Sequence, residues 1–166
     1  MTYDVSLTEP VYALEHAREE MTGLLDEFVK DTTGVTLAVL ASRDGIKQVF
    51  PSHMTSKDEI DWLDELAASS AGLMALAKGT TGPTGHKLPV GQLLIERTDS
   101  LFLLTEAGIG HSFTDSGKTV ATVLLVLVAT DANIGQVAYD AGVMVQRFAP
   151  FMTTPVRVLS QDDGVA

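Results

Sequence analysis

The strongest candidate for chemistry in this chain of 166 residues is the run Ser116-Gly117-Lys118-Thr119, which is similar to the end of a phosphate-binding P-loop. That motif requires a second glycine five residues before Gly117, where this sequence has Ser112. It also requires a helix after the loop, because amide groups at the helix N-terminus hold the phosphates. Since Lys118 leads into the most strand-like run of the chain, the sequence predicts no nucleotide or cofactor site here.

Histidines could bind a metal or act as general bases, and the chain has four, at His16, His53, His86 and His111. No two of them have the spacing of metal ligands on one helix, and no carboxylate array accompanies them. His111, Ser112 and Asp115 share one loop, whereas the members of a Ser-His-Asp triad converge from separate elements. We therefore interpret the histidines as surface residues and predict no metal site.

Acidic residues cluster on one predicted helix, at Asp58, Asp61, Asp64 and Glu65. General acid–base chemistry needs an apolar pocket that raises the pKa of a carboxylate, and none is evident, so a solvated face is the simpler explanation. The absence of cysteine excludes thiol catalysis, disulfides and cysteine-bound clusters. Together these patterns predict no catalytic residue and a protein that is not an enzyme.

The composition is that of one acidic domain. Eleven Lys and Arg against 22 Asp and Glu leave a formal net charge of −11, which argues against a nucleic-acid partner because a groove for nucleic acid needs clustered cations. The longest apolar run, residues 119–130, is too short to cross a bilayer, and the first residues lack the pattern of a signal peptide. We expect a cytoplasmic protein with no membrane insertion, a flexible lead at 1–11, a domain at 12–150 and an irregular tail at 151–166.

Hydrophobic periodicity predicts three helices and five strands. Apolar residues recur at spacings of three and four over 12–32, 57–78 and 133–148, which predicts amphipathic helices. Two hairpins are predicted over 35–50 and 90–106, because turn residues separate their β-prone runs.

A third β-prone run, 120–128, is apolar almost throughout and is typical of a central strand covered on both faces. Glycine-rich loops are predicted at 80–89 and 108–118. Because hairpins join neighbouring strands, the fold class is α+β, with a mainly antiparallel sheet and helices on both of its faces.

The second helix has more apolar surface than one sheet face can cover. Ser56 and Glu59 form a capping box at its start. Two apolar stripes then cover roughly 200° of its circumference, against about 100° for an ordinary surface helix. The second stripe needs a further partner, which is either a loop or terminal segment of the same chain or a second copy. Small residues over 67–72 favour a second copy, and the second stripe comprises Trp62, Leu66, Ser69, Leu73 and Leu76.

Three motifs occur in a recognisable order. The first is Gly34-Val35 leading into Ala-Val-Leu-Ala-Ser-Arg-Asp-Gly at 38–45, whose Ser-Arg-Asp-Gly turn is the most specific. The second is Leu-Met-Ala-Leu-Ala at 73–77, and the third is Asp-Ala-Asn-Ile-Gly-Gln-Val-Ala-Tyr at 131–139. With these motifs the chain resembles the roadblock/LC7 (dynein light chain) family over about residues 12–150. The resemblance is to bacterial members related to the regulator of a Ras-like GTPase in gliding motility.

The resemblance implies a profilin-like architecture, a five-stranded antiparallel sheet with the second helix on one face and the first and last helices on the other. It also implies a homodimer in which second helices pair and third strands join edge to edge. Carried onto this sequence, the dimer interface comprises Leu63, Leu66, Ala67, Ser70, Leu73, Met74, Val90, Gln92 and Leu94. The loop at 108–118 is longer than the turn usual in the family.

Functionally, the resemblance implies a non-enzymatic regulator or scaffold that binds a small Ras-like GTPase and, in many bacteria, acts beside a sensor-kinase-like protein. It assigns no residue of this chain to GTPase contact. Two alternatives stay open. One is a small-molecule sensor of PAS or GAF type, which needs a pocket between sheet and helix. The other is a purely structural subunit of a larger assembly.

Overall fold

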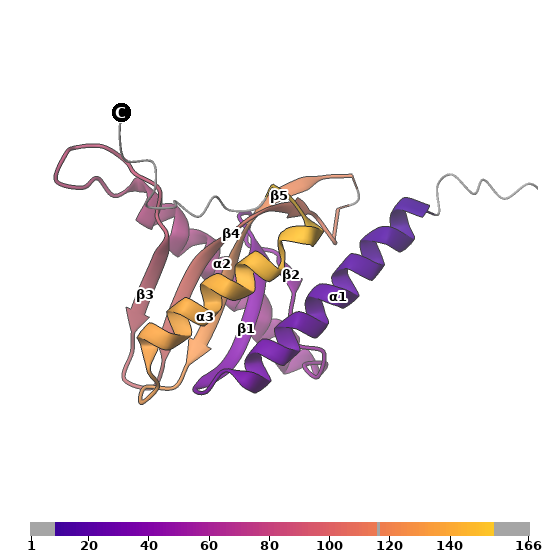
Figure 1. Cartoon of the computed structure of the whole chain (residues 1–166), viewed down its shortest axis with the longest axis horizontal. Coiled ribbons are helices and arrows are strands. Elements are labelled where there is room, and N and C mark those ends of the chain that lie inside the picture. The colour runs from indigo at the N-terminus through magenta and orange to yellow at the C-terminus, as the bar shows by residue number, and fades with distance from the viewer. Residues whose placement is uncertain (1–8, 116, 155–166) are drawn as a thin grey trace, which may run out of the picture.

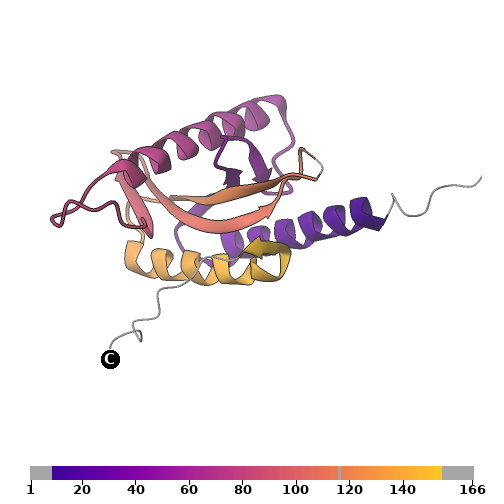
Figure 2. The ribbon, with the colours of Figure 1, turned by 90° about the horizontal axis from the view of Figure 1, so that it is seen from above.

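The computed structural model describes residues 9–115 and 117–154, which form a sheet between two layers of helices (Figures 1 and 2). None of the helices in these ranges is long and apolar enough to cross a membrane. In chain order the elements are α1 (Glu9–Asp31), β1 (Val35–Ser42), β2 (Lys47–Val49), α2 (Lys57–Gly79), β3 (Gln92–Glu96), β4 (Leu101–His111), β5 (Thr119–Val128), α3 (Ile134–Arg147), the 3-10 turn η2 (Ala149–Phe151) and β6 (Met152–Thr154).

The strands pair antiparallel in the order β2-β1-β5-β4-β3, and the short β6 pairs with the far end of β4. The central strand β5 pairs with β1 on one side and with β4 along its whole length on the other. Its nearly continuous apolar sequence follows from this position, since both faces of the strand are covered. The free edges of the main path belong to β2 and β3.

Helix α2 packs on one face of the sheet, and α1 and α3 pack on the other (Figure 2). The α1 and α3 side is closed by a cluster that includes Leu25, Phe28 and Phe148. The α2 side is closed by a second cluster that includes Leu63 and Leu104. This layer arrangement confirms the α+β fold predicted from the sequence.

One of the two predicted glycine-rich loops is partly strand. Strand β4 continues to His111 and β5 begins at Thr119, so residues 108–111 of the loop predicted for 108–118 belong to the sheet. Glycines suggested a loop there, but Gly110 serves a close approach instead. A Cβ at Gly110 would lie 2.9 Å from the sulfur of Met152, which belongs to β6.

The chain ends also differ from the prediction within the described ranges. Helix α1 begins at Glu9, so residues 9–11 are helical rather than part of a flexible lead. Residues 152–154 form β6 rather than an irregular tail, because the exposed side of β4 offers them a pairing partner. The rest of the predicted lead and tail, 1–8 and 155–166, lies outside the described residues.

Gly34 lies in the connection between α1 and β1 and has a positive backbone φ angle. Gly34 has φ +89°, and a Cβ there would lie 2.3 Å from the Cβ of Ala132, at the start of the α3 segment. The exposed Gly23 in the middle of α1 has no such constraint, since a Cβ there would meet nothing within 4 Å.

We expect opposite effects of the same substitution at these two glycines. Gly34→Ala lowers the free energy of unfolding by about 1–3 kcal/mol, because alanine is strained at positive φ and has no space. Gly23→Ala raises it by about 0.5–1 kcal/mol through helix propensity. Urea unfolding of both variants measures the difference, and equal stabilities would contradict the role given to Gly34.

Candidate partner interface on helix α2 and strand β3

Helix α2 begins at the capping box predicted from the sequence. The Ser56 hydroxyl accepts a hydrogen bond from the Glu59 amide at 3.2 Å, and the Glu59 carboxylate accepts from the amides of Ser56 and Thr55 at 3.0 Å. Hydrogen bonding lowers the pKa of Glu59 below its ordinary value. The largest effect comes from the Ser56 amide, followed by the Ser56 side chain and the Thr55 amide. The cap fixes where α2 starts and therefore which of its rows faces the sheet.

One row of α2 belongs to the core of the protomer. Leu63, Ala67, Ser70 and Met74 are buried, and the Ser70 hydroxyl donates to the carbonyl of Leu66 at 2.7 Å. Leu63 and Met74 pack in the cluster that lies against the sheet. These four residues were expected in the dimer interface, yet the sheet already covers them and they have almost no surface left for a partner.

The neighbouring row of α2 is uncovered except at Leu66, which is buried and packs in the cluster against the sheet. Trp62 is 41% exposed and Leu76 is 74% exposed, with Ser69 exposed and Leu73 half-buried between them. Among the described elements, α2 packs mainly against β1, β5 and β2. The three-and-four spacing of the second stripe marked these residues in the sequence. The expected interface nevertheless omitted Trp62 and Leu76.

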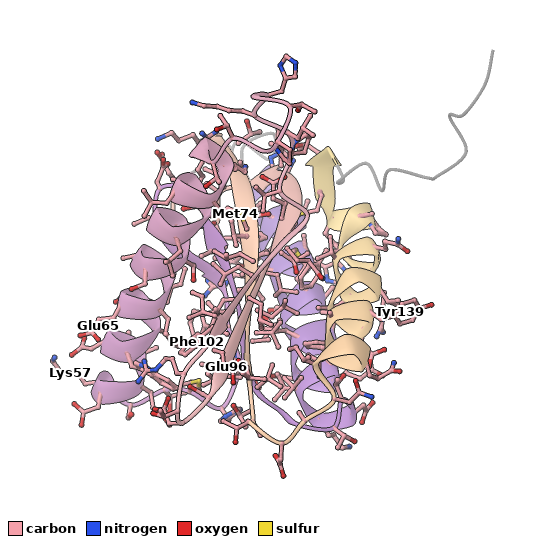
Figure 3. All side chains as sticks on the ribbon, turned by 90° about the vertical axis from the view of Figure 1, so that its left-hand side faces the viewer. Lys57, Glu65, Met74, Glu96, Phe102 and Tyr139 are labelled. Carbon is pink, nitrogen blue, oxygen red and sulfur yellow. The ribbon has the colours of Figure 1, made fainter. Side chains whose placement is uncertain are left out.

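Strand β3 forms a free edge of the sheet. Figure 3 looks onto this edge, with α2 on one side of it and α3 on the other. Leu94 is 48% exposed on it, whereas the Gln92 amide donates to the carbonyl of Ala138 in α3 at 3.1 Å. Val90 lies two residues before the strand and packs, half-buried, on the α2 side. An edge strand with unpaired main-chain groups can add a further strand.

A groove of about 580 Å³ lies beside the N-terminal half of α2, next to the turn between β3 and β4. We name it the α2 groove. The Arg97 guanidinium lies 5.7 Å from the ring centre of Phe102, and its Nε lies 3.1 Å from a carboxylate oxygen of Asp99. A hydrogen bond from the Ser100 hydroxyl, and then the Arg97 charge, hold the pKa of Asp99 below its ordinary value. The lining residues are Thr36, Trp62, Glu65, Leu66, Ser69, Arg97, Asp99, Ser100, Phe102, Leu127, Val128 and Ala129.

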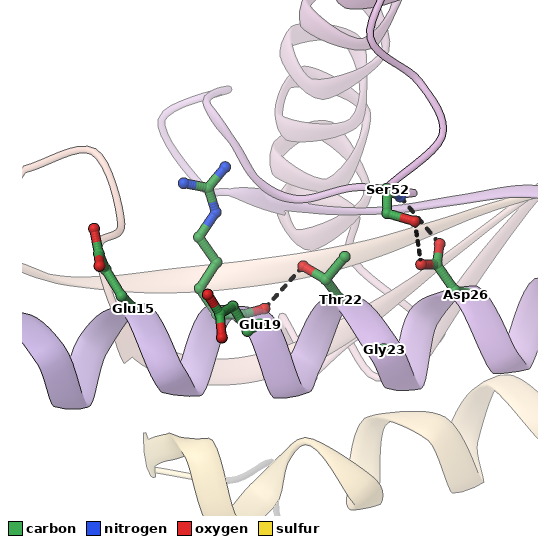
Figure 4. A pocket seen from close by; sticks show the side chains of 7 residues that line it. Glu15, Glu19, Thr22, Gly23, Asp26 and Ser52 are labelled. Atoms are coloured by element: carbon green, nitrogen blue, oxygen red, sulfur yellow. Dashed lines mark hydrogen bonds between the residues drawn. The ribbon is translucent and has the colours of Figure 1, made fainter.

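A second groove, of about 460 Å³, lies along α1 (Figure 4). Three of its polar side chains, Thr22, Asp26 and Ser52, are already paired. The Asp26 carboxylate accepts from the Ser52 amide at 3.1 Å and from the Ser52 hydroxyl at 2.6 Å, and the Thr22 hydroxyl donates to the Arg18 carbonyl at 2.8 Å. The Asp26–Ser52 contacts tie the segment after β2 to α1, which is a structural role.

The residues that first suggested chemistry do not assemble into a reactive site. Lys118 precedes strand β5, as the sequence predicted, and its ammonium lies 3.6 Å from Asp115. The Ser112 hydroxyl accepts hydrogen bonds from the amides of Thr114 and Asp115, which makes a local turn rather than a triad with His111. Within the described ranges, no group of three or more His, Asp or Glu residues could hold a metal ion.

The capping box predicts a pH-dependent contribution to stability. Because the pKa of Glu59 is lowered in the folded chain, its contribution is present at neutral pH and is lost as the pH falls through that lowered pKa. Glu59→Leu is therefore less stable than the parent chain at pH 7, and the difference closes in acid. Urea unfolding between pH 7 and pH 3 measures it, with Glu65→Leu as the control on the same helix. A difference that is independent of pH would contradict this role of the carboxylate.

Comparison with known proteins places the fold. A Roadblock/LC7 domain model matches residues 21–113. The solved Roadblock/LC7 domain from Streptomyces avermitilis is 26% identical, with a TM-score of 0.62, and the match covers 78% of this chain and 95% of that domain. No curated protein matches this sequence.

Two solved gliding-protein structures share the fold. The gliding protein MglB from Thermus thermophilus is 18% identical with a TM-score of 0.61, over 81% of this chain and 90% of that one. MglB from Myxococcus xanthus is 17% identical with a TM-score of 0.57, over 79% of this chain and 93% of that one. Since the domain model spans more than half of the sequence and the fold agrees, the chain belongs to the Roadblock/LC7 family.

Proposed function

We propose that this chain is a homodimeric, non-enzymatic regulator or scaffold that binds a small Ras-like GTPase in the cytoplasm. One observation supports this most directly: large apolar side chains are exposed both on α2, at Trp62 and Leu76, and on the free edge strand β3, at Leu94. Such a surface is typical of a site that binds another protein.

A two-fold axis perpendicular to the sheet satisfies both parts of this surface at once. It pairs β3 with β3 of a second copy in antiparallel fashion, and it keeps both α2 helices on the same face. Ser69 and Gly72 lie near the middle of the exposed row, and open space surrounds Gly72, so two helices can approach closely there. Of the residues expected in the interface, Leu73, Gln92 and Leu94 keep a place in it, and Trp62 and Leu76 join them.

Magnitudes indicate that both elements are needed. Covering the exposed parts of Trp62, Leu76 and Leu94 contributes about 1 kcal/mol each, or about 6 kcal/mol for the two copies together. Association costs about 4–15 kcal/mol, so the apolar row alone is marginal. Main-chain hydrogen bonds along the β3 edge, at about 0.5–1.5 kcal/mol each, supply the rest.

The GTPase partner is inferred from family membership and from the fold shared with MglB. The chemistry of the chain agrees with a binding role, since the described residues hold no reactive constellation. A sensor-kinase-like protein is a further partner that the same resemblance suggests. We assign no individual residue to the GTPase contact.

A small-molecule sensor is the alternative from another class. It requires a polar pocket enclosed between sheet and helix, but the space directly under α2 is filled by Leu63, Leu104 and Leu125, all buried. The α2 groove lies at the edge of the helix instead, among exposed residues such as Trp62 and Asp99. In the described part of the chain every buried side-chain nitrogen or oxygen has a hydrogen-bond partner, so no group awaits a ligand. These observations favour the protein-binding role.

Reversing the polarity of the exposed row tests the dimer. Leu76→Arg raises the dimer dissociation constant by about tenfold or more, because it places an unpaired charge in the interface. Tyr139→Arg is the matched control, since Tyr139 is 70% exposed on α3 and points away from α2 (Figure 3). Analytical ultracentrifugation measures both variants, and equal dissociation constants would place the interface elsewhere.

Capture from lysate of the source cells tests the regulator role. The full chain serves as bait with GDP and, separately, with a non-hydrolysable GTP analogue, and mass spectrometry identifies the bound proteins. We expect a Ras-like GTPase to be enriched in one nucleotide state. Recovery of the GTPase independent of nucleotide would indicate a structural subunit, and recovery of no GTPase would contradict the proposed partner.

A further inference from the structure

The segment between α2 and β3, residues 80–91, projects from the body of the protomer past the β3 edge (Figures 1 and 2). We name it the arm. Its tip is a closed turn, in which the Gly85 amide donates to the Gly82 carbonyl at 2.9 Å and the Gly82 amide donates to the His86 carbonyl at 3.4 Å. Residues 80–89 are all exposed, and Leu88 exposes 66% of its surface.

We propose that the arm of each copy docks in the α2 groove of the other copy, so that the dimer exchanges two arms. This inference rests on the dimer of the proposed function and adds a second contact to it. The occupant of the α2 groove is then a segment of this same chain, and the groove is completed only when the partner is present.

Strand direction brings the two parts together. In an antiparallel pair of β3 strands, the residues that precede Gln92 in one copy run beside the residues that follow Glu96 in the other. With the pair centred on Leu93 or Leu94, residues 87–89 lie beside the partner's turn at 97–100. Arg97, Asp99 and Ser100 of that turn line the α2 groove.

The arm and the α2 groove also lie at the same level between the helix layer and the sheet. The arm starts at the end of α2 and descends to the sheet at β3, so it spans the level between helix and sheet (Figure 2). The α2 groove lies at this same level, because its walls come from α2 on one side and from β4 and β5 on the other. An arm that crosses the β3 edge therefore meets the partner's groove.

The chemistry of the two surfaces is complementary. The exposed Leu88 matches the apolar floor formed by Leu66, Phe102 and Leu127. Beside it, Lys87 carries a positive charge on the arm, and Glu65 carries a negative charge on the groove rim, where Asp99 is already paired with Arg97. Docking covers an exposed leucine and brings opposite charges together, which is the pattern of a specific protein contact.

Disulfide trapping tests the exchange. Because the chain has no native cysteine, only the introduced cysteines can form a bond. Two single-cysteine full-length variants, Leu88→Cys and Ser100→Cys, are purified with tags of different mass, mixed and mildly oxidised. A bond between them must join two chains and requires Cα atoms within about 7 Å. We expect the 88–100 heterodimer to form in high yield. Lys30→Cys replaces Ser100→Cys as the control, because Lys30 is exposed on α1, which packs against β1 and β2 at the opposite side of the sheet.

The outcomes separate the two proposals. A dimer in which the 88–100 bond exceeds the 88–30 control supports the exchange. A dimer with equal yields overturns the exchange, leaves the groove for a different partner and keeps the dimer. A monomer in ultracentrifugation overturns both.

A charge swap gives an independent measurement. Lys87→Glu weakens the dimer by about two- to fivefold, the effect of one exposed ion pair. Adding Glu65→Lys to the same chain restores the affinity, because the partner's rim then attracts the reversed arm. Lys30→Glu is the matched charge change away from the interface. If Lys87→Glu and Lys30→Glu have the same dimer affinity, the arm does not reach the acidic rim.

Discussion

The structure depends on covering both faces of β5 and its two neighbours. This strand pairs along its length with β1 and β4, and its side chains point alternately into the two clusters. Leu124 and Leu125 point to opposite faces of the sheet, and each must be buried from water. Each cluster therefore requires helices on its own face of the sheet. The sheet is therefore stable only when the three helices cover its two faces.

The two faces are covered unequally, and the candidate interface follows from that inequality. Two helices, α1 and α3, share one face, whereas α2 alone covers the other and packs over β1, β2 and β5. The β3 side of the α2 face is left with half-buried Leu93, Ile95 and Phe102. A second copy is the simplest cover, since it brings another α2 and another β3 in a symmetric contact.

Much of the fold could be predicted from local patterns. The capping box at Ser56, the Asp-Gly turn at 44–45 and the apolar run of β5 each depend on neighbours in sequence, and each is present in the structure. The ends of β4 and the pairing of β6 could not be predicted, because a glycine signals a loop unless a distant residue such as Met152 packs against it. The expected interface combined two rows of α2 for a similar reason, because the periodicity does not say which row faces the sheet.

The sequence by itself determined that the protein is an acidic α+β domain without the residue spacing of a known reaction, and that α2 has more apolar surface than one sheet face can cover. Those properties follow from composition and from contacts three or four residues apart. Only the tertiary structure decided that Leu63, Ala67, Ser70 and Met74 belong to the core while Trp62 and Leu76 stay exposed. It also placed the turn at 97–100 beside α2 as one wall of a groove. These facts depend on how α2 rotates and crosses the sheet, and packing between segments far apart in sequence sets that rotation.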